Sequence, residues 1–124
     1  MKAWTRGERV GKLVRQILAD RLSRGTSERD LEGVIITDVK MAPDIKMASI
    51  YFQLLQGDRE PARVERALAA LERAKHLLHQ ELRKQMKIKF VPTLRFFHDA
   101  SLDRVHRLES IFRELDDERH DDES

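Results

Sequence analysis

A long helical pattern over residues 61–86 lies between segments with the composition of β-strands, and this order constrains the fold more than any other feature. The apolar residues of this pattern lie on one face of a helix, and neither glycine nor proline interrupts the pattern after Pro61. Residues 34–39 are largely β-branched, and residues 46–55 alternate apolar and polar side chains. Residues 91–97 predict a third strand, which can rejoin the sheet only after the helical crossover. The sequence therefore favours a mixed sheet.

Local signals place the remaining elements. Thr5 and Glu8 have the spacing of a capping box, which predicts a helix start near Arg6. A glycine with small polar neighbours ends this helix at residues 24–27, and residues 42–44 have the turn chemistry of an antiparallel hairpin. Asp99 and Ser101 can cap a last short helix.

These elements predict an α+β fold in which helices cover one face of a three-stranded sheet. We expect a single domain over residues 1–115 and an acidic, disordered tail over residues 116–124, which has almost nothing to bury. The residues assigned to the core are Val34, Ile36, Ile50, Phe52, Leu71 and Phe96.

The charge is distributed unevenly along the chain. The 124 residues carry a net charge of +2, but residues 114–124 hold seven acids against Arg119 alone, a sum of −6. Residues 1–113 therefore carry +8. An excess of this size on a small domain is typical of proteins that bind a phosphate backbone. A basic surface that only keeps the protein in solution stays open as an alternative.

Two clusters hold much of this basic charge. Arg9, Lys12 and Arg15 lie opposite the apolar stripe of the first helix. The second cluster runs from the end of the long helix into the third strand and contains no acid. Its members are Arg83, Lys84, Lys87, Lys89 and Arg95. Cations in the last turn of a helix suit its macrodipole, but that local benefit applies to one or two residues, not to five.

The residue types give no support for catalysis. No nucleophile with an adjacent base and no phosphate-binding glycine loop occurs in the sequence. His76 and His79 lie three apart, but no recognisable motif completes a metal site around them. We therefore expect no enzymatic activity, no cofactor and no metal. The chain also lacks cysteine, a signal-peptide pattern and an apolar run of about 20 residues, which favours a cytoplasmic protein away from membranes.

The order of motifs resembles the ribosome-binding factor A family over about residues 6–115. Arg9-Val10 and residues 17–22 are similar to the first helix of the family, and residues 33–39 to its first strand. Pro43-Asp44, Ala48 and Tyr51 are similar to its turn and second strand. The most specific stretch runs from Val91 to Ser101 in the pattern V-P-x-L-x-F-x-x-D-x-S.

The resemblance implies a type II KH-like fold of order α-β-β-α-α-β, in which two helices meet at a kink in place of a G-x-x-G loop. The kink of the family commonly has the sequence Ala-x-Gly, and the matching residues here are Ala74, Lys75 and His76. The resemblance further implies a non-enzymatic assembly factor that binds the immature 30S small ribosomal subunit and its 16S rRNA near the 5′ end. Such a factor promotes late rRNA processing, is released by an assembly GTPase and supports growth in the cold.

We hypothesise that the basic side chains contact the phosphates of folded ribosomal RNA and read its shape, not its base sequence. The candidate RNA-binding residues are Arg6, Arg9, Lys12, Arg15, Lys75, Arg83, Lys84, Lys87, Lys89 and Arg95. We expect a monomer, and we expect the acidic tail to compete with phosphate for this surface. A protein-interaction module with an acidic partner and a DNA-binding protein stay open as alternatives, although no helix-turn-helix or finger pattern occurs.

Overall fold

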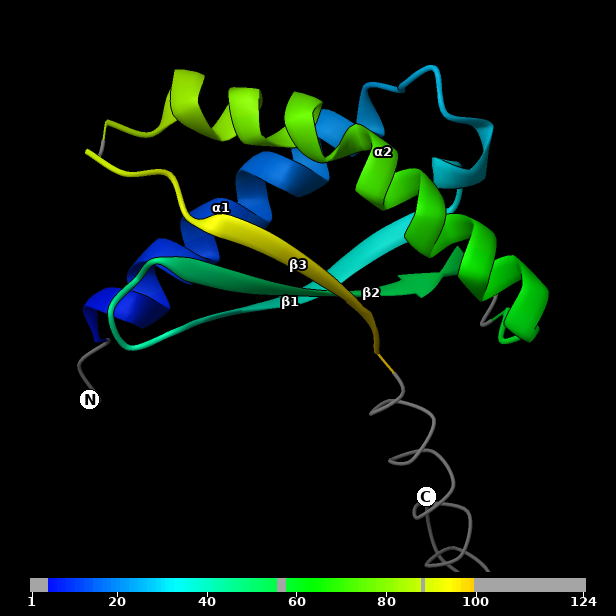
Figure 1. Cartoon of the computed structure of the whole chain (residues 1–124), viewed down its shortest axis with the longest axis horizontal. Coiled ribbons are helices and arrows are strands. Elements are labelled where there is room, and N and C mark those ends of the chain that lie inside the picture. The colour runs from blue at the N-terminus through cyan, green and yellow to red at the C-terminus, as the bar shows by residue number, and fades with distance from the viewer. Residues whose placement is uncertain (1–4, 56–57, 88, 100–124) are drawn as a thin grey trace, which may run out of the picture.

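The computed structural model describes residues 5–55, 58–87 and 89–99, and its first element is helix α1 (Arg6–Ser23) (Figure 1). The predicted capping box is confirmed, because the Thr5 hydroxyl accepts from the Glu8 amide at 3.1 Å and Glu8 accepts from the Thr5 amide at 2.8 Å. Gly25, with φ of +90°, follows the helix end as expected for a residue in the left-handed region. The predicted last helix and the acidic tail lie outside the described residues.

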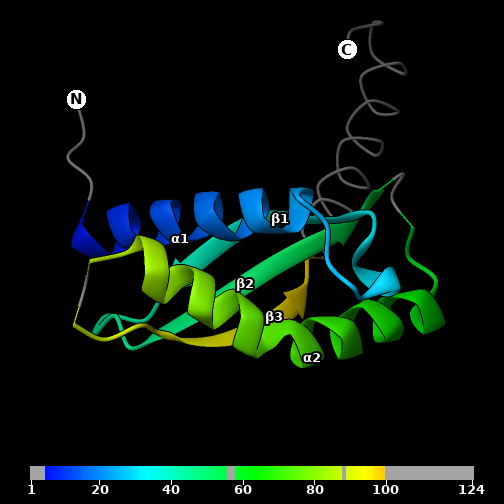
Figure 2. The same cartoon turned by 90° about the horizontal axis from the view of Figure 1, so that it is seen from above.

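The three predicted strands form one mixed sheet in the order β1-β2-β3. β1 (Val34–Met41) and β2 (Met47–Leu54) pair antiparallel through the predicted hairpin, and β2 pairs parallel with β3 (Thr93–His98). Helix α2 (Pro61–Gln85) supplies the crossover between the parallel strands. The expected mixed sheet is therefore confirmed. Figures 1 and 2 show α1 and α2 side by side over one face of it.

Alternation along the strands divides the sheet into a buried and an open face. In β2, every second residue faces the helices and is buried. These residues are Ala48, Ile50, Phe52 and Leu54. In β1, a bulge at Thr37 lets Ile36 and Val39, three residues apart, both pack against the helices. The predicted core is confirmed except for Val34, which is half-buried because it pairs with Leu54 at the end of the β1–β2 ladder.

Helix α2 differs from the helix pair that the resemblance implied. It is one continuous helix of 25 residues, with no interruption at Ala74, Lys75 or His76. Both views show that it bends midway along its length without breaking (Figures 1 and 2). Sharp kinks occur mainly at proline or glycine, and His76 occupies the place of the usual glycine. The two expected helices are therefore a single bent helix here.

Candidate nucleic-acid interface

A groove with basic walls lies between the first turns of α1 and the β1–β2 hairpin. Its volume is about 860 Å³, and Arg6, Lys12 and Arg15 line it together with Lys40 from β1. Glu8 and Asp38 also line the groove, so cations outnumber acids along its walls. The open N-terminal amides of a helix favour anions, and α1 begins at this groove.

Gly11 sets how closely α1 approaches β1 beside the groove. It is buried, and a Cβ at this position would lie 3.0 Å from the Val39 carbonyl oxygen and 3.3 Å from Met41 Cγ. A larger residue would therefore push the helix away from the strand. The shape of the basic groove depends on the absence of a side chain at Gly11.

The second predicted cluster, except for Arg95, lies at the same end of the molecule. The C-terminal end of α2 and the segment after it lie toward the end where α1 begins, and both views agree on this (Figures 1 and 2). Arg83, Lys84 and Lys87 are exposed there. Lys89 is exposed as well, with its Nζ 5.8 Å from the centre of the Phe90 ring. We call these residues, the groove cations and the exposed Arg9 of α1 the basic end. Its members are Arg6, Arg9, Lys12, Arg15, Lys40, Arg83, Lys84, Lys87 and Lys89.

Most cations of the basic end form no ion pair in the described part of the chain. Lys84 lies near Glu81, whose pKa is lowered by a hydrogen bond from Gln85 and by the charges of Arg24 and Lys84. No ion pair within residues 5–55, 58–87 and 89–99 involves the following side chains: Arg6, Arg9, Arg15, Arg83, Lys84 and Lys87. Their donors are therefore available to phosphate oxygens. Helix α2 also presents its carbonyl end here, where cations are favoured.

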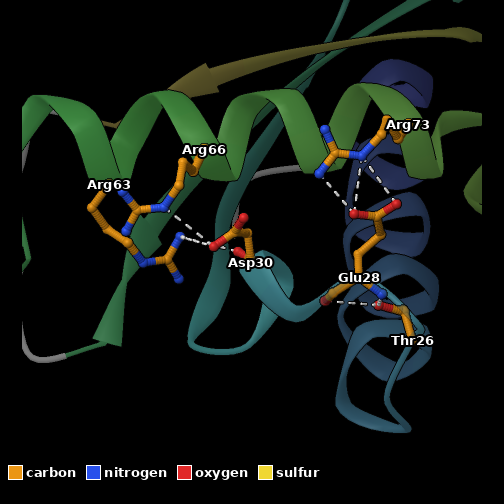
Figure 3. Close-up of polar contacts among 6 residues, drawn as sticks. All are labelled: Thr26, Glu28, Asp30, Arg63, Arg66 and Arg73. Atoms are coloured by element: carbon orange, nitrogen blue, oxygen red, sulfur yellow. Dashed lines mark hydrogen bonds and ion pairs between the residues drawn. The ribbon is translucent and has the colours of Figure 1, made fainter.

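A second set of arginines is neutralised at a distance from the basic end (Figure 3). Arg73 donates to both carboxylate oxygens of Glu28, at 3.0 and 3.1 Å from Nε. This hydrogen bonding lowers the pKa of Glu28 and raises the pKa of Arg73. Arg66 Nε lies 3.4 Å from Asp30 Oδ1, and Arg63 lies 4.0 Å from the same oxygen. We call these five residues the paired cluster.

The paired cluster also fixes the short 3₁₀ helix η1 (Arg29–Leu31) against α2. Arg63 donates to the backbone carbonyls of Asp30 at 3.1 Å and Glu32 at 2.8 Å. The Glu28 amide donates to the Thr26 hydroxyl at 3.1 Å, which holds the turn before η1 (Figure 3). The arginines of this region have a structural role.

Two candidate residues lie apart from the basic end. Arg95 alternates with the buried Leu94 and Phe96, so it lies on the open face of the sheet. Lys75 forms an ion pair with Glu72 at 2.9 Å, and its Nζ lies 5.8 Å from the Phe96 ring centre. The structure therefore does not bring these two side chains together with the groove.

Lys40 is a member of the basic end that the charge clusters in the sequence did not indicate. It is a single cation within β1, and its nearest charged neighbour in sequence is Asp38. In the folded chain it lines the groove together with Arg6 and Lys12 of α1, which are far from it in the sequence. The alternation of β1 places it on the exposed side of the strand, but only the packing of α1 adds it to the groove.

The described residues contain no group of three or more histidine, cysteine or acidic side chains arranged to hold a metal ion. Within the same residues, no helix is long and apolar enough to cross a lipid bilayer.

Comparison with known proteins identifies the family of this chain. The family model of ribosome-binding factor A matches residues 6–112. The ribosome-binding factor A of Bradyrhizobium sp. strain BTAi1 is 44% identical over 108 residues, which cover 85% of this chain and 75% of that protein.

Solved structures show the same fold. The crystal structure of ribosome-binding factor A from Thermus thermophilus superposes with a TM-score of 0.64 at 23% identity, over 74% of this chain and 93% of that chain. A Thermus thermophilus ribosome binding factor A model, fitted into a cryo-EM map of its complex with the 30S subunit, has a TM-score of 0.55 at 19% identity and covers 73% of this chain and 91% of that one. The family model, the sequence identity to relatives and the shared α+β fold show that this chain belongs to the ribosome-binding factor A family.

Proposed function

We propose that this protein binds the immature 30S small ribosomal subunit and places its basic end on the phosphates of folded 16S rRNA. The observation that carries the proposal is the gathering of exposed cations around the groove, most of them without an ion pair among the described residues. Phosphate contacts supply much of the affinity of RNA-binding proteins, and they position a protein without reading sequence. The 30S complex of the Thermus thermophilus relative supports the choice of subunit.

The same proposal includes the biological role that the family implies. The protein acts in the cytoplasm as a monomer, near the 5′ end of 16S rRNA, and promotes late rRNA processing and subunit maturation without catalysing a reaction. An assembly GTPase releases it. Sedimentation of a cell lysate should find the protein with free small subunits and not with translating ribosomes.

A pair of matched charge variants tests the contact surface. Lys84→Gln with Lys87→Gln removes two charges from the basic end, and Arg66→Gln with Arg73→Gln removes two charges from the paired cluster. Binding to free small subunits is measured for each variant over a range of salt concentrations. The lysine variant should bind more weakly, and its salt slope should fall by about one unit per lost phosphate contact.

The arginine variant is the control, because its guanidinium groups already bond to Glu28 and Asp30. It should keep the salt slope of the unmodified protein. Equal losses in both variants would show that net charge alone governs binding, and an unchanged slope in the lysine variant would contradict the assignment of the basic end.

A further inference from the structure

The open face of the sheet carries an aromatic pair that the phosphate contacts do not use. Tyr51 of β2 and Phe97 of β3 are register partners, and their rings are stacked with centroids 5.4 Å apart and planes at 27°. The side chain of Phe97 is 36% exposed. Both helices lie on the opposite face (Figure 2), so no described element covers these rings. Exposed aromatic rings on neighbouring strands are a known platform for nucleic acid bases.

One cation lies near each ring of this pair, and Asp38 of β1 is the register partner of Tyr51. Lys40 Nζ lies 5.9 Å from the centre of the Tyr51 ring, and the Arg95 guanidinium carbon lies 5.7 Å from the centre of the Phe97 ring. Both cations pair in register with Ser49, so they occupy one row across the sheet next to the aromatic row. A stacking surface bordered by a row of positive charge suits a ligand that has flat bases and a phosphate backbone.

Lys40 connects this platform to the basic groove. It lines the groove beside Lys12 and Arg15, and it also lies over the Tyr51 ring. A single RNA strand with its phosphates along the groove could therefore continue over the edge strand β1 onto the open face. This continuity favours RNA over a protein partner, because a protein that is only acidic would use the cations and leave the ring faces unoccupied.

We propose that the open face of the sheet binds single-stranded RNA, with an unpaired base stacked on Phe97 and Tyr51 and with Lys40 and Arg95 on the adjoining phosphates. The inference rests on the proposed function in taking RNA as the ligand, but it assigns a different surface and a different RNA conformation. Arg95, which the fold separates from the basic end, has its binding role on this surface. Stacking tolerates many sequences because every base has a flat face.

The binding test uses the full chain and a uridine oligonucleotide as the single-stranded probe. Loss of one base–aromatic stack weakens such binding by about fivefold to hundredfold on truncation to alanine. Phe97→Leu keeps apolar bulk but removes the ring, so we expect a loss near the lower limit, about fivefold. Phe97→Trp keeps a ring and should bind as well as the unmodified protein. Thermal unfolding of each variant establishes that it is folded, and Arg95→Gln tests the phosphate contact without changing the rings.

Tyr51 is the only tyrosine of the chain, so its ring gives a unique NMR signal after selective labelling. Upfield shifts of this signal on addition of the oligonucleotide, together with the Phe97→Leu loss, would support the inference. Unmoved Tyr51 signals with moving α1 and α2 amide signals would overturn it and leave the proposed function intact. If no signal moves with the oligonucleotide or with 16S rRNA, both proposals fail. Contacts from residues after Asp99 to these rings that persist with RNA would show that the chain itself occupies the face, which also overturns the inference.

Discussion

The basic end and the paired cluster are both rich in cationic side chains, yet they differ in how many of these side chains form ion pairs within the described residues. In the paired cluster, Arg66 and Arg73 direct their donors at Asp30 and Glu28. At the basic end, Lys84 and Lys87 have no ion pair within the described residues. The difference indicates that the position of the acids, more than the number of cations, decides which cations of this protein keep their donors available to a phosphate group. A cation whose donors are already bonded offers little to a phosphate group.

We expect the largest effect from a substitution at Gly11. This residue lies beside the basic groove and is distant in sequence from the paired cluster. Gly11→Leu would force α1 away from the Val39 carbonyl, because even a Cβ would lie only 3.0 Å from that oxygen. Overpacking of this kind costs about 1–3 kcal/mol. Urea unfolding should show this loss, and RNA binding by the folded fraction should fall as the groove changes shape.

Gly7→Leu is the matched control for this substitution. A Cβ at Gly7 would make ordinary contacts, at 3.8 Å from Met41 Cβ and 3.9 Å from Thr5 Oγ1. The control should therefore be more stable than Gly11→Leu. Gly7 also lines the groove, so this pair of variants compares stability and not RNA affinity. Equal stability of the two variants would show that the close approach of α1 to β1 does not limit the size of the residue at Gly11.

The paired cluster should become an RNA-binding surface when its acids are neutralised. Glu28→Gln with Asp30→Asn keeps the side-chain shapes but releases Arg73 and Arg66. Affinity for unrelated RNA should rise, and its salt slope should increase by up to about two units if both arginines reach phosphates. Filter binding at several salt concentrations measures both quantities. Specific binding to free small subunits should gain less, because the new surface lies apart from the basic end.

Glu60→Gln with Glu65→Gln is the control for this gain. It also removes two negative charges, but from the start of α2. Neither of these two side chains has an ion pair with a described residue. A long-range effect of net charge would raise RNA affinity equally in both variants. A larger gain on removal of Glu28 and Asp30 would show that the local release of arginine donors is the cause.

Features determined by neighbouring residues could be predicted from the sequence, and features determined by distant contacts could not. The capping box of Thr5 and Glu8 and the alternation along β2 depend on short spacings, and both are confirmed. The contact of Arg73 with Glu28 joins residues 45 positions apart and depends on where η1 packs. Lys40 was missed for the same reason, since only the packing of α1 on β1 adds it to the groove. A family pattern also misled: His76 lacks the freedom of glycine, and α2 stays continuous there.

The smallest expected difference between the two regions is in their response to acid. The hydrogen bond from Arg73 lowers the pKa of Glu28 below its ordinary value of 4.5. A carboxyl with a lowered folded-state pKa stabilises the fold at pH values above the ordinary pKa. This contribution is lost as the pH falls through the folded-state pKa.

Arg73→Gln removes the hydrogen bond that lowers the pKa of Glu28, so the variant should be slightly less stable than the unmodified protein near neutral pH. The two melting temperatures should converge as the pH falls below 4.5 and through the lowered pKa of Glu28. Lys87→Gln, at the basic end, should instead follow the unmodified protein in parallel, because no described acid pairs with Lys87. Convergence in the lysine variant, or its absence in the arginine variant, would contradict the assignment of Glu28 as the acid-sensitive partner in the paired cluster.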